Sequence, residues 1–145
     1  MAEVFEPLEG GCLCGQFRYR VTAAPVDGSY CHCRMCQRAS GAPLQASAEF
    51  PAQAFEVTAG RLKAYRSSAS ALRRFCPDCG SQISFEQVEN PTYVSLNLGS
   101  LDRPELLPPR MHIWRESRLS WFETTDDLPR YDREGPPVGG ERMRG

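Results

Sequence analysis

Apolar and polar side chains alternate along much of the chain, and this pattern predicts short β-strands. Residues 16–22 read QFRYRVT, which places Phe17, Tyr19 and Val21 on one side of an extended chain. Because successive strand residues point to opposite faces, these three side chains are expected to be buried. Residues 92–98 alternate as cleanly, with apolar and polar side chains on opposite faces.

Several further segments have the length and the turn-forming boundaries of strands. They are residues 44–50, 55–58, 61–65, 72–75, 82–88, 111–114 and 119–122. The segments 55–58 and 61–65 flank Ala59-Gly60 and resemble the two arms of a hairpin. Residues 34–40 are expected to form one short helical turn that ends at Gly41. Short strands separated by turns predict a mainly β domain.

The chain length of 145 residues suits one domain with its own hydrophobic core. We expect this domain to span residues 8–132. Residues 101–110 contain three prolines and predict an irregular crossing. Residues 133–145 offer little to bury and are expected to form a flexible C-terminal tail.

Composition and charge argue against several classes of binding partner for this protein. The net charge of −1, from 17 basic and 18 acidic residues, argues against a nucleic-acid partner. No apolar run is long enough for a transmembrane helix, so no membrane partner is expected. The acidic N-terminus lacks the basic and apolar regions of a signal peptide, which favours a cytoplasmic location. The oligomeric state is not predicted by these features.

Seven cysteines fall into three groups, a Cys-x-Cys pair, a cluster of three thiols and a Cys-x-x-Cys pair. In a reducing compartment, clustered cysteines favour metal binding over disulfides. The alternative is a disulfide framework with one unpaired thiol, and the odd number of cysteines argues against it.

The Cys-x-x-Cys pair, Cys76 and Cys79, has the spacing of a zinc knuckle. Pro77 presets φ, and Gly80 permits the positive φ that turns backbone N–H groups toward sulfur. Such a knuckle needs two further ligands. Cys12 and Cys14 can supply them, since residues two apart in an extended chain share a face. This partition predicts a closed, structural site with four cysteine ligands.

Cys31, Cys33 and Cys36 then remain, close enough in sequence to hold a second ion. A site with three protein ligands leaves a position for water or substrate. His32 is expected to point away from the ion, in a hydrogen-bonded or exposed position. His112 is expected to be a partly buried histidine with its hydrogen bonds satisfied.

A rival partition joins two Cys-x-x-Cys pairs, Cys33/Cys36 and Cys76/Cys79, into an ordinary zinc ribbon. The protein would then be a binding module, and Cys12, Cys14 and Cys31 would have no role. Sequence spacing alone leaves this partition open.

The cysteine motifs resemble those of the glutathione-dependent formaldehyde-activating enzyme family, which includes the centromere-protein-V-like domains. The motifs are GGCLCG at 10–15, CHCRMCQR at 31–38 and FCPDCG at 75–80, with MHIW at 111–114, WFE at 121–123 and DDLP at 126–129. The resemblance spans residues 8–132 and implies a mainly β, Mss4-like sheet fold with zinc knuckles. It also implies a structural zinc on Cys12, Cys14, Cys76 and Cys79, and a catalytic zinc on Cys31, Cys33 and Cys36.

The same resemblance implies an enzyme of the carbon–sulfur lyase class. The expected reaction is that of S-(hydroxymethyl)glutathione synthase, the addition of a thiol such as glutathione to formaldehyde or a related aldehyde. Arg34 and Arg38 are the cations nearest in sequence to the three thiols, and they are candidates for binding the carboxylates of glutathione. The alternatives are a non-catalytic zinc scaffold that binds protein or nucleic acid, and a redox sensor built on zinc-bound thiols.

Overall fold

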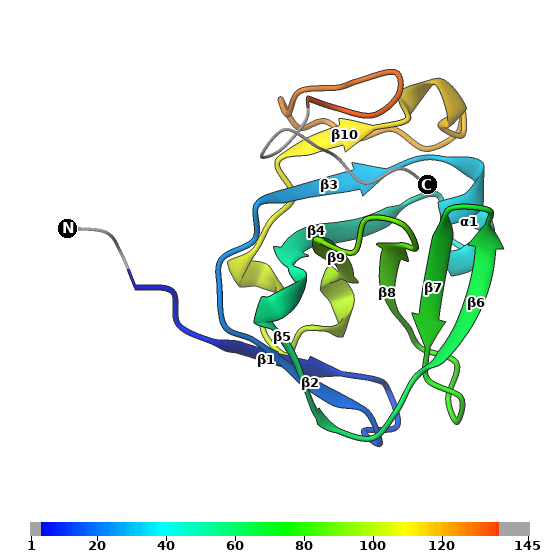
Figure 1. The fold of residues 1–145 in the computed structure, drawn as a ribbon. Helices are drawn as coiled ribbons and strands as arrows, with labels where there is room; N and C mark the ends of the chain where they lie inside the picture. Colours follow the sequence, from blue (N-terminus) through cyan, green and yellow to red (C-terminus); the bar gives the residue numbers. More distant parts are fainter. Residues whose placement is uncertain (1–3, 137–145) are drawn as a thin grey trace.

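A computed structural model describes residues 4–136 and arranges them in two β-sheets (Figure 1). The smaller sheet has the order β1-β2-β5, with β1 (Leu8–Gly11), β2 (Arg18–Val21) and β5 (Phe55–Ala59) all antiparallel. Residues 137–145, most of the tail expected from the sequence, lie outside the described residues.

The larger sheet has seven strands in the order β10-β3-β4-β9-β8-β7-β6. Its strands are β3 (Asp27–Cys31), β4 (Gln45–Pro51), β6 (Lys63–Ser68), β7 (Ala71–Phe75), β8 (Gln82–Gln87), β9 (Tyr93–Asn97) and β10 (Met111–Ile113). The helical segments are α1 (Arg34–Ser40) and four single 3-10 turns, η1 (Ala52–Ala54), η2 (Leu98–Ser100), η3 (Pro104–Leu106) and η4 (Arg115–Ser117). The mainly β, single-domain architecture expected from the sequence is confirmed.

The hydrophobic core lies where the small sheet packs on one face of the large sheet. Phe17, Tyr19 and Val21 from the β2 region are at most 1% exposed, as their alternation predicts. From the large sheet, Leu96 of β9 and Phe50 of β4 join them in one buried cluster. Burial of these large side chains supplies the main favourable free energy of folding.

The opposite face of the large sheet is polar. On β4, Gln45, Ser47 and Glu49 alternate with the residues that enter the core, and on β9 Ser95 and Asn97 do the same. Because side chains alternate between faces, one side of these strands can serve the core while the other lines a cavity. The sheet therefore presents a row of amides, hydroxyls and a carboxylate next to the cysteine cluster.

β10 lies parallel to β3, whereas the other strand neighbours in the large sheet are antiparallel. The register pairs His112 with Tyr30 and Ile113 with Cys31. A parallel neighbour requires a long crossover connection. Here that connection is the chain between β3 and β10, and it brings the C-terminal part of the domain beside the cysteine cluster.

The structure differs from the sequence-based expectations about strands in three respects. The hairpin expected about Ala59-Gly60 does not form, because β5 joins the small sheet beside β2 while β6 joins the large sheet beside β7. Residues 119–122 form a turn, in which Phe122 N–H donates to Leu119 O, instead of a strand. Strands β1 and β3 were not expected, because their glycines and short length give no clear alternation.

A left-handed glycine separates the two sheets at the end of β5. Gly60 has φ of +74°, and a Cβ at this position would lie 2.1 Å from Gln16 O. Only glycine permits both the positive φ and this close approach. From here the chain continues into β6 of the large sheet.

Helix α1 begins directly after the cysteine cluster. Cys33 is its N-cap, and its Sγ accepts a hydrogen bond of 3.3 Å from Cys36 N–H. Gly41 ends the helix, as the sequence predicts, and does so with the left-handed φ of 70°. Within residues 4–136, no helix has the length and apolar character needed to cross a bilayer.

Candidate metal centres and active site

Two separate groups of cysteine thiols are assembled by the fold. The first contains Cys12, Cys14, Cys76 and Cys79, and the second contains Cys31, Cys33 and Cys36. In each group the sulfurs lie within 4.8 Å of one another. All seven cysteines are free thiols, so the disulfide framework is wrong. The zinc ribbon is also wrong, because Cys33 and Cys36 do not join Cys76 and Cys79.

The four-cysteine group joins the turn after β1 to the turn after β7. Cys12 Sγ lies 3.6 Å from Cys14 Sγ, and Cys14 Sγ lies 3.8 Å from Cys76 Sγ. A tetrahedral zinc ion with Zn–S bonds of about 2.3 Å needs sulfurs about 3.8 Å apart. The geometry therefore fits one tetrahedral ion with all four positions filled by protein.

Hydrogen bonds to sulfur prepare this group to carry negative charge. Phe17 N–H donates to Cys12 Sγ at 3.3 Å, and Cys79 N–H donates to Cys76 Sγ at 3.4 Å. The side-chain amide of Gln16 also donates to Cys76 Sγ, at 3.2 Å. Hydrogen bonds from Ser81 lower the pKa of Cys79 to about 6. These donors favour the thiolate forms that a metal ion requires.

The three-cysteine group occupies the end of β3 and the start of α1. Cys31 is the last residue of the strand, Cys33 caps the helix and Cys36 lies in its first turn. Among the described residues, no fourth histidine, cysteine or carboxylate ligand belongs to this group. Hydrogen bonds with the other two thiols lower the pKa of Cys33 well below its usual range, and the charge of Arg73 acts in the same direction.

All three thiols of this group line a cavity of about 270 Å³ on the polar face of the large sheet. Its floor carries Gln45, Ser47, Glu49, Ser95 and Asn97, and its walls include Arg73, Phe85 and Trp114. Glu49 and Arg73 are 8% and 7% exposed, so two charged side chains are buried here. A concave site with a few convergent polar groups is the usual form of a small-molecule site.

The two arginines proposed from the sequence occupy different places. Arg34 lines this cavity and donates a hydrogen bond to Gln37 Oε1. Arg38, one helical turn later, lines a neighbouring depression together with Lys63 and Tyr65. Arg73 lines both hollows, and sequence reasoning missed it because 37 residues separate it from Cys36. No local signal marks it, because its place at the cavity follows from the pairing of β7 with β8.

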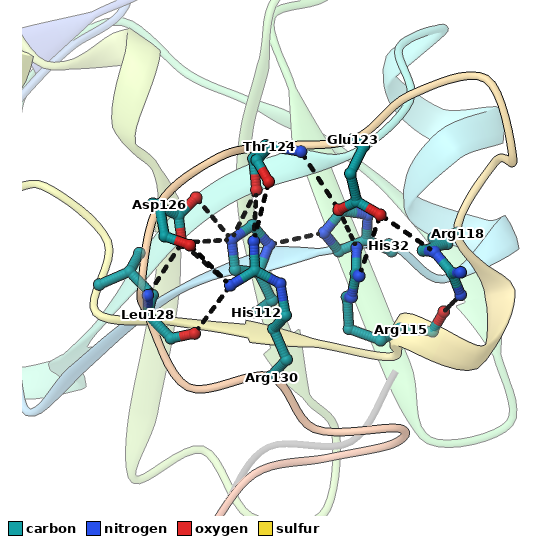
Figure 2. Close-up of polar contacts among 9 residues, drawn as sticks. All are labelled: His32, His112, Arg115, Arg118, Glu123, Thr124, Asp126, Leu128 and Arg130. Atoms are coloured by element: carbon teal, nitrogen blue, oxygen red, sulfur yellow. Dashed lines mark hydrogen bonds and ion pairs between the residues drawn. The ribbon is translucent and has the colours of Figure 1, made fainter.

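A buried chain of hydrogen bonds leads from His32, the residue between Cys31 and Cys33, through His112 to Asp126 (Figure 2). His32 Nε2 lies 2.8 Å from His112 Nδ1, and His112 Nε2 lies 3.0 Å from Asp126 Oδ2. His32 is 1% exposed and His112 is fully buried. The expectation that His32 is exposed is therefore wrong, and its hydrogen-bonded alternative is confirmed.

The carboxylate sets the proton positions in this chain. An ionised Asp126 accepts only, so His112 Nε2 carries the proton that it shares with Asp126. His112 Nδ1 is then an acceptor, and His32 Nε2 must be the donor. His32 Nδ1 is left as an unprotonated nitrogen, buried and without a hydrogen-bond partner among the described residues. A buried acceptor without a partner costs less free energy than a buried N–H group without one.

The pKa shifts agree with this arrangement. Burial lowers the pKa of His32 to about 4, and the nearby His112 and Arg115 add to the effect. Hydrogen bonds from Thr124 and His112 hold the pKa of Asp126 well below its usual range. At neutral pH, therefore, His32 is neutral and Asp126 is ionised.

The segment that carries Asp126 is itself held by Arg130, as Figure 2 shows. The Arg130 guanidinium donates to Thr124 O at 3.1 Å, to Asp126 O at 3.0 Å and to Leu128 O at 2.9 Å. The side-chain amide of Gln37 adds a bond of 2.7 Å to His32 O. These contacts hold His32, the residue between Cys31 and Cys33, from two sides.

Comparisons with known proteins agree with this geometry. The sequence profile of the family described as glutathione-dependent formaldehyde-activating enzyme matches residues 7–117. A Halomonas elongata protein provisionally named glutathione-dependent formaldehyde-activating enzyme is 28% identical over 125 residues, which cover 80% of each protein. An uncharacterized lyase of Schizosaccharomyces pombe is 29% identical over 91 residues, covering 60% of this chain and 64% of that protein.

A solved structure supports the fold. The crystal structure of a Rhodobacter sphaeroides protein superposes with a TM-score of 0.56 at 24% identity, over 66% of this chain and 88% of the other. The family profile covers both cysteine groups and most of the cavity. The chain belongs to the glutathione-dependent formaldehyde-activating enzyme family.

Proposed function

We propose that the protein is a zinc-dependent enzyme of carbon–sulfur chemistry, which adds a thiol such as glutathione to formaldehyde or a related aldehyde and catalyses the reverse cleavage. One observation carries this proposal. Within residues 4–136, three thiols with no fourth protein ligand in their group converge on a cavity that a small molecule can enter. The family membership and the lyase name of one relative support the same reaction class.

The two cysteine groups have different roles in this proposal. Cys12, Cys14, Cys76 and Cys79 hold a structural ion, while Cys31, Cys33 and Cys36 hold the ion at the reaction site. Zinc at the second site supplies a Lewis acid that also favours the thiolate form of a thiol. The donor set fits zinc, because clustered thiolate ligands are typical of its sites.

In the reaction itself, the substrate sulfur forms a bond to the aldehyde carbon. The π bond of the carbonyl breaks at the same carbon. The thiol gives up one proton and the carbonyl oxygen gains one, so the product is a hydroxyl group. The reverse reaction breaks the carbon–sulfur bond and returns both molecules. The cavity brings the two reactants together, which favours a reaction between a thiol and a carbonyl.

The cations around the cavity are placed to receive an anionic substrate. We propose that Arg34, at the cavity, and Arg38, at the neighbouring depression, attract the carboxylates of a glutathione-like thiol. The polar floor formed by Gln45, Ser95 and Asn97 can bond to the peptide groups of such a molecule.

Exchange NMR on mixtures of formaldehyde and glutathione tests the reaction. Because the addition proceeds without catalyst, the measured quantity is the exchange rate between free and adduct forms with and without protein. We expect faster exchange with the wild type and the uncatalysed rate with Cys33→Ser. The same rate with and without wild-type protein would contradict the enzyme and favour a zinc scaffold.

A further inference from the structure

Arg73 is a buried cation beside the three-cysteine group, and none of the roles above requires it. It lies on β7, is 7% exposed and points into the cavity. Its Nη2 lies 3.8 Å from Cys36 Sγ, and its Nη1 donates to Gln45 Oε1 at 3.1 Å. Its guanidinium carbon lies 5.0 Å from the centre of the Phe85 ring.

These contacts hold the guanidinium in one place. The amide oxygen of Gln45 and the face of Phe85 fix its plane, and both are favourable partners for a guanidinium. Removing a full charge from water carries a large cost unless opposite charge compensates it. A buried arginine whose Nη2 lies 3.8 Å from a thiol sulfur is therefore well placed to balance negative charge on the sulfurs, in addition to that of Glu49, which lines the same cavity.

The charge of a loaded site supplies that compensation. Three thiolates and one divalent ion carry a net charge of −1, and a fourth, incoming thiolate raises it to −2. At the four-cysteine group (the closed group), four thiolates and one divalent ion also give a net charge of −2. There Cys14 is exposed to solvent, and several N–H groups donate hydrogen bonds to sulfur. At the three-cysteine group no thiol is exposed, so screening by water is weaker there than at Cys14.

We propose that Arg73 is the positioning residue that makes the open site selective for an anionic sulfur ligand, because its guanidinium balances the charge that a bound thiolate adds. This inference rests on the proposed function and deepens it, since it selects thiolates over neutral ligands at the fourth position. Arg73 acts through Cys36 and the charge of the site, and it need not touch the substrate.

Ligand titrations of the cobalt-substituted protein test this directly. Cobalt(II) reports a new thiolate ligand by charge-transfer absorption, and the closed site contributes a constant background. The probes are 2-mercaptoethanol, which binds as an anion and carries no carboxylate, and imidazole, which binds as a neutral ligand. The variants are Arg73→Gln and Arg73→Met, with Arg73→Lys as the conservative replacement.

Arg74→Gln is the matched control. Arg74 is the next residue on β7, so its side chain points to the opposite face, where it forms an ion pair with Glu86 outside the cavity. Its replacement by glutamine therefore removes one positive charge without changing the cavity. Circular dichroism and the cobalt content of each variant verify that the fold and both metal sites are kept. Arg73→Gln and Arg73→Met are both neutral but differ in shape, so the test can still be made if one of them does not fold.

We expect Arg73→Gln and Arg73→Met to weaken 2-mercaptoethanol binding by about tenfold to a hundredfold, the effect of losing one charged partner. Arg73→Lys should recover much of this loss, and imidazole binding should change little in any variant. Unchanged thiol binding would overturn the inference. So would an equal loss for imidazole, which indicates a purely structural role.

The outcome is independent of catalysis. If the wild type binds thiol but does not accelerate formaldehyde exchange, the proposed reaction fails while the role of Arg73 is still measured. If exchange is accelerated but Arg73→Gln binds thiol normally, the reaction stands and the role of Arg73 is wrong.

Discussion

His32 Nε2 and His112 Nδ1 lie 2.8 Å apart in the interior of the protein, joined by a hydrogen bond that connects the residue after β3 to β10. One histidine sits between two cysteines of the open group, and the other sits on β10, which is parallel to β3. Asp126 completes the chain from a segment close to the C-terminus. The residue between two of the thiols is thus linked to His112 and Asp126, 80 and 94 positions further along the chain, which the spacing of the cysteines does not reveal.

The histidine pair makes a testable contribution to stability. His112→Phe keeps a ring at the position stacked 4.9 Å from Tyr30 but removes both hydrogen bonds. It leaves the N–H of His32 without an acceptor, and each buried unsatisfied group costs about 1–3 kcal/mol. We expect the free energy of unfolding, from urea denaturation, to fall by about 2–4 kcal/mol. Arg110→Gln, an exposed position before β10, is the control, and equal stability of the two variants would disprove the role of the pair.

Metal content separates the two cysteine groups. We expect two zinc ions per chain in the fully reduced wild type and one in Cys33→Ser. Serine retains the N-cap of α1 but is a poor zinc ligand, so this variant should stay folded. Cys79→Ser should lose cooperative unfolding, because structural zinc contributes about 10–16 kcal/mol in small peptides. Elemental analysis with thermal unfolding measures both effects, and one zinc in the reduced wild type would refute the assignment.

Gly60 and Gly41 form a natural comparison. Both have positive φ, but a Cβ at Gly60 meets Gln16 O at 2.1 Å, whereas one at Gly41 meets no atom within 4 Å. Gly41→Ala should therefore lower stability by only about 1–2 kcal/mol, the cost of the left-handed conformation. Gly60→Ala should cost clearly more and displace Gln16, whose side chain donates to Cys76 Sγ.

Displacing Gln16 should also weaken zinc binding at the four-cysteine group, and a competing chelator measures this effect. Zinc should leave the closed group faster in Gly60→Ala than in Gly41→Ala when a chromogenic chelator competes for it. The same release rate and the same stability in both variants would show that the close approach of Gln16 has no role in holding this group.

Tyr19 gives the stability a specific dependence on alkaline pH. Burial raises the pKa of Tyr19 from 10.0 to about 12, and its hydroxyl is hydrogen-bonded to Ser100 Oγ at 2.6 Å. The unfolded chain loses this proton near pH 10 and the folded chain does not, so stability falls as pH rises from about 10 to 12. Tyr19→Phe removes this contribution.

Urea unfolding at two pH values measures it. Between pH 8 and pH 11 the wild type should lose about 1.4 kcal/mol more than Tyr19→Phe, one pKa unit of proton linkage. At pH 8 the variant should be less stable by about 0.5–1.5 kcal/mol, the contribution of one hydrogen bond. Parallel loss of stability in both proteins would show that Tyr19 ionises normally in the folded state.

The sequence by itself determined the features that depend on local spacing. The alternation in β2 and β9 places their buried side chains correctly, because two residues along a strand always share a face. The cluster from Cys31 to Cys36 needs only one strand end and one helical turn to gather its thiols. Gly41 and Gly80 both have the positive φ that their positions after a helix and a knuckle require.

The tertiary structure decided which strands are neighbours, and with them the rest of the site. Strand pairing joins segments far apart in the chain, and a short alternating run pairs equally well with many partners. For this reason β5 and β6 looked like one hairpin but belong to different sheets, and Arg73 gave no sign of its place beside Cys36. The sequence identifies the cysteine clusters, but only the folded sheet shows the cavity that Cys31, Cys33 and Cys36 line and the buried Arg73 beside Cys36.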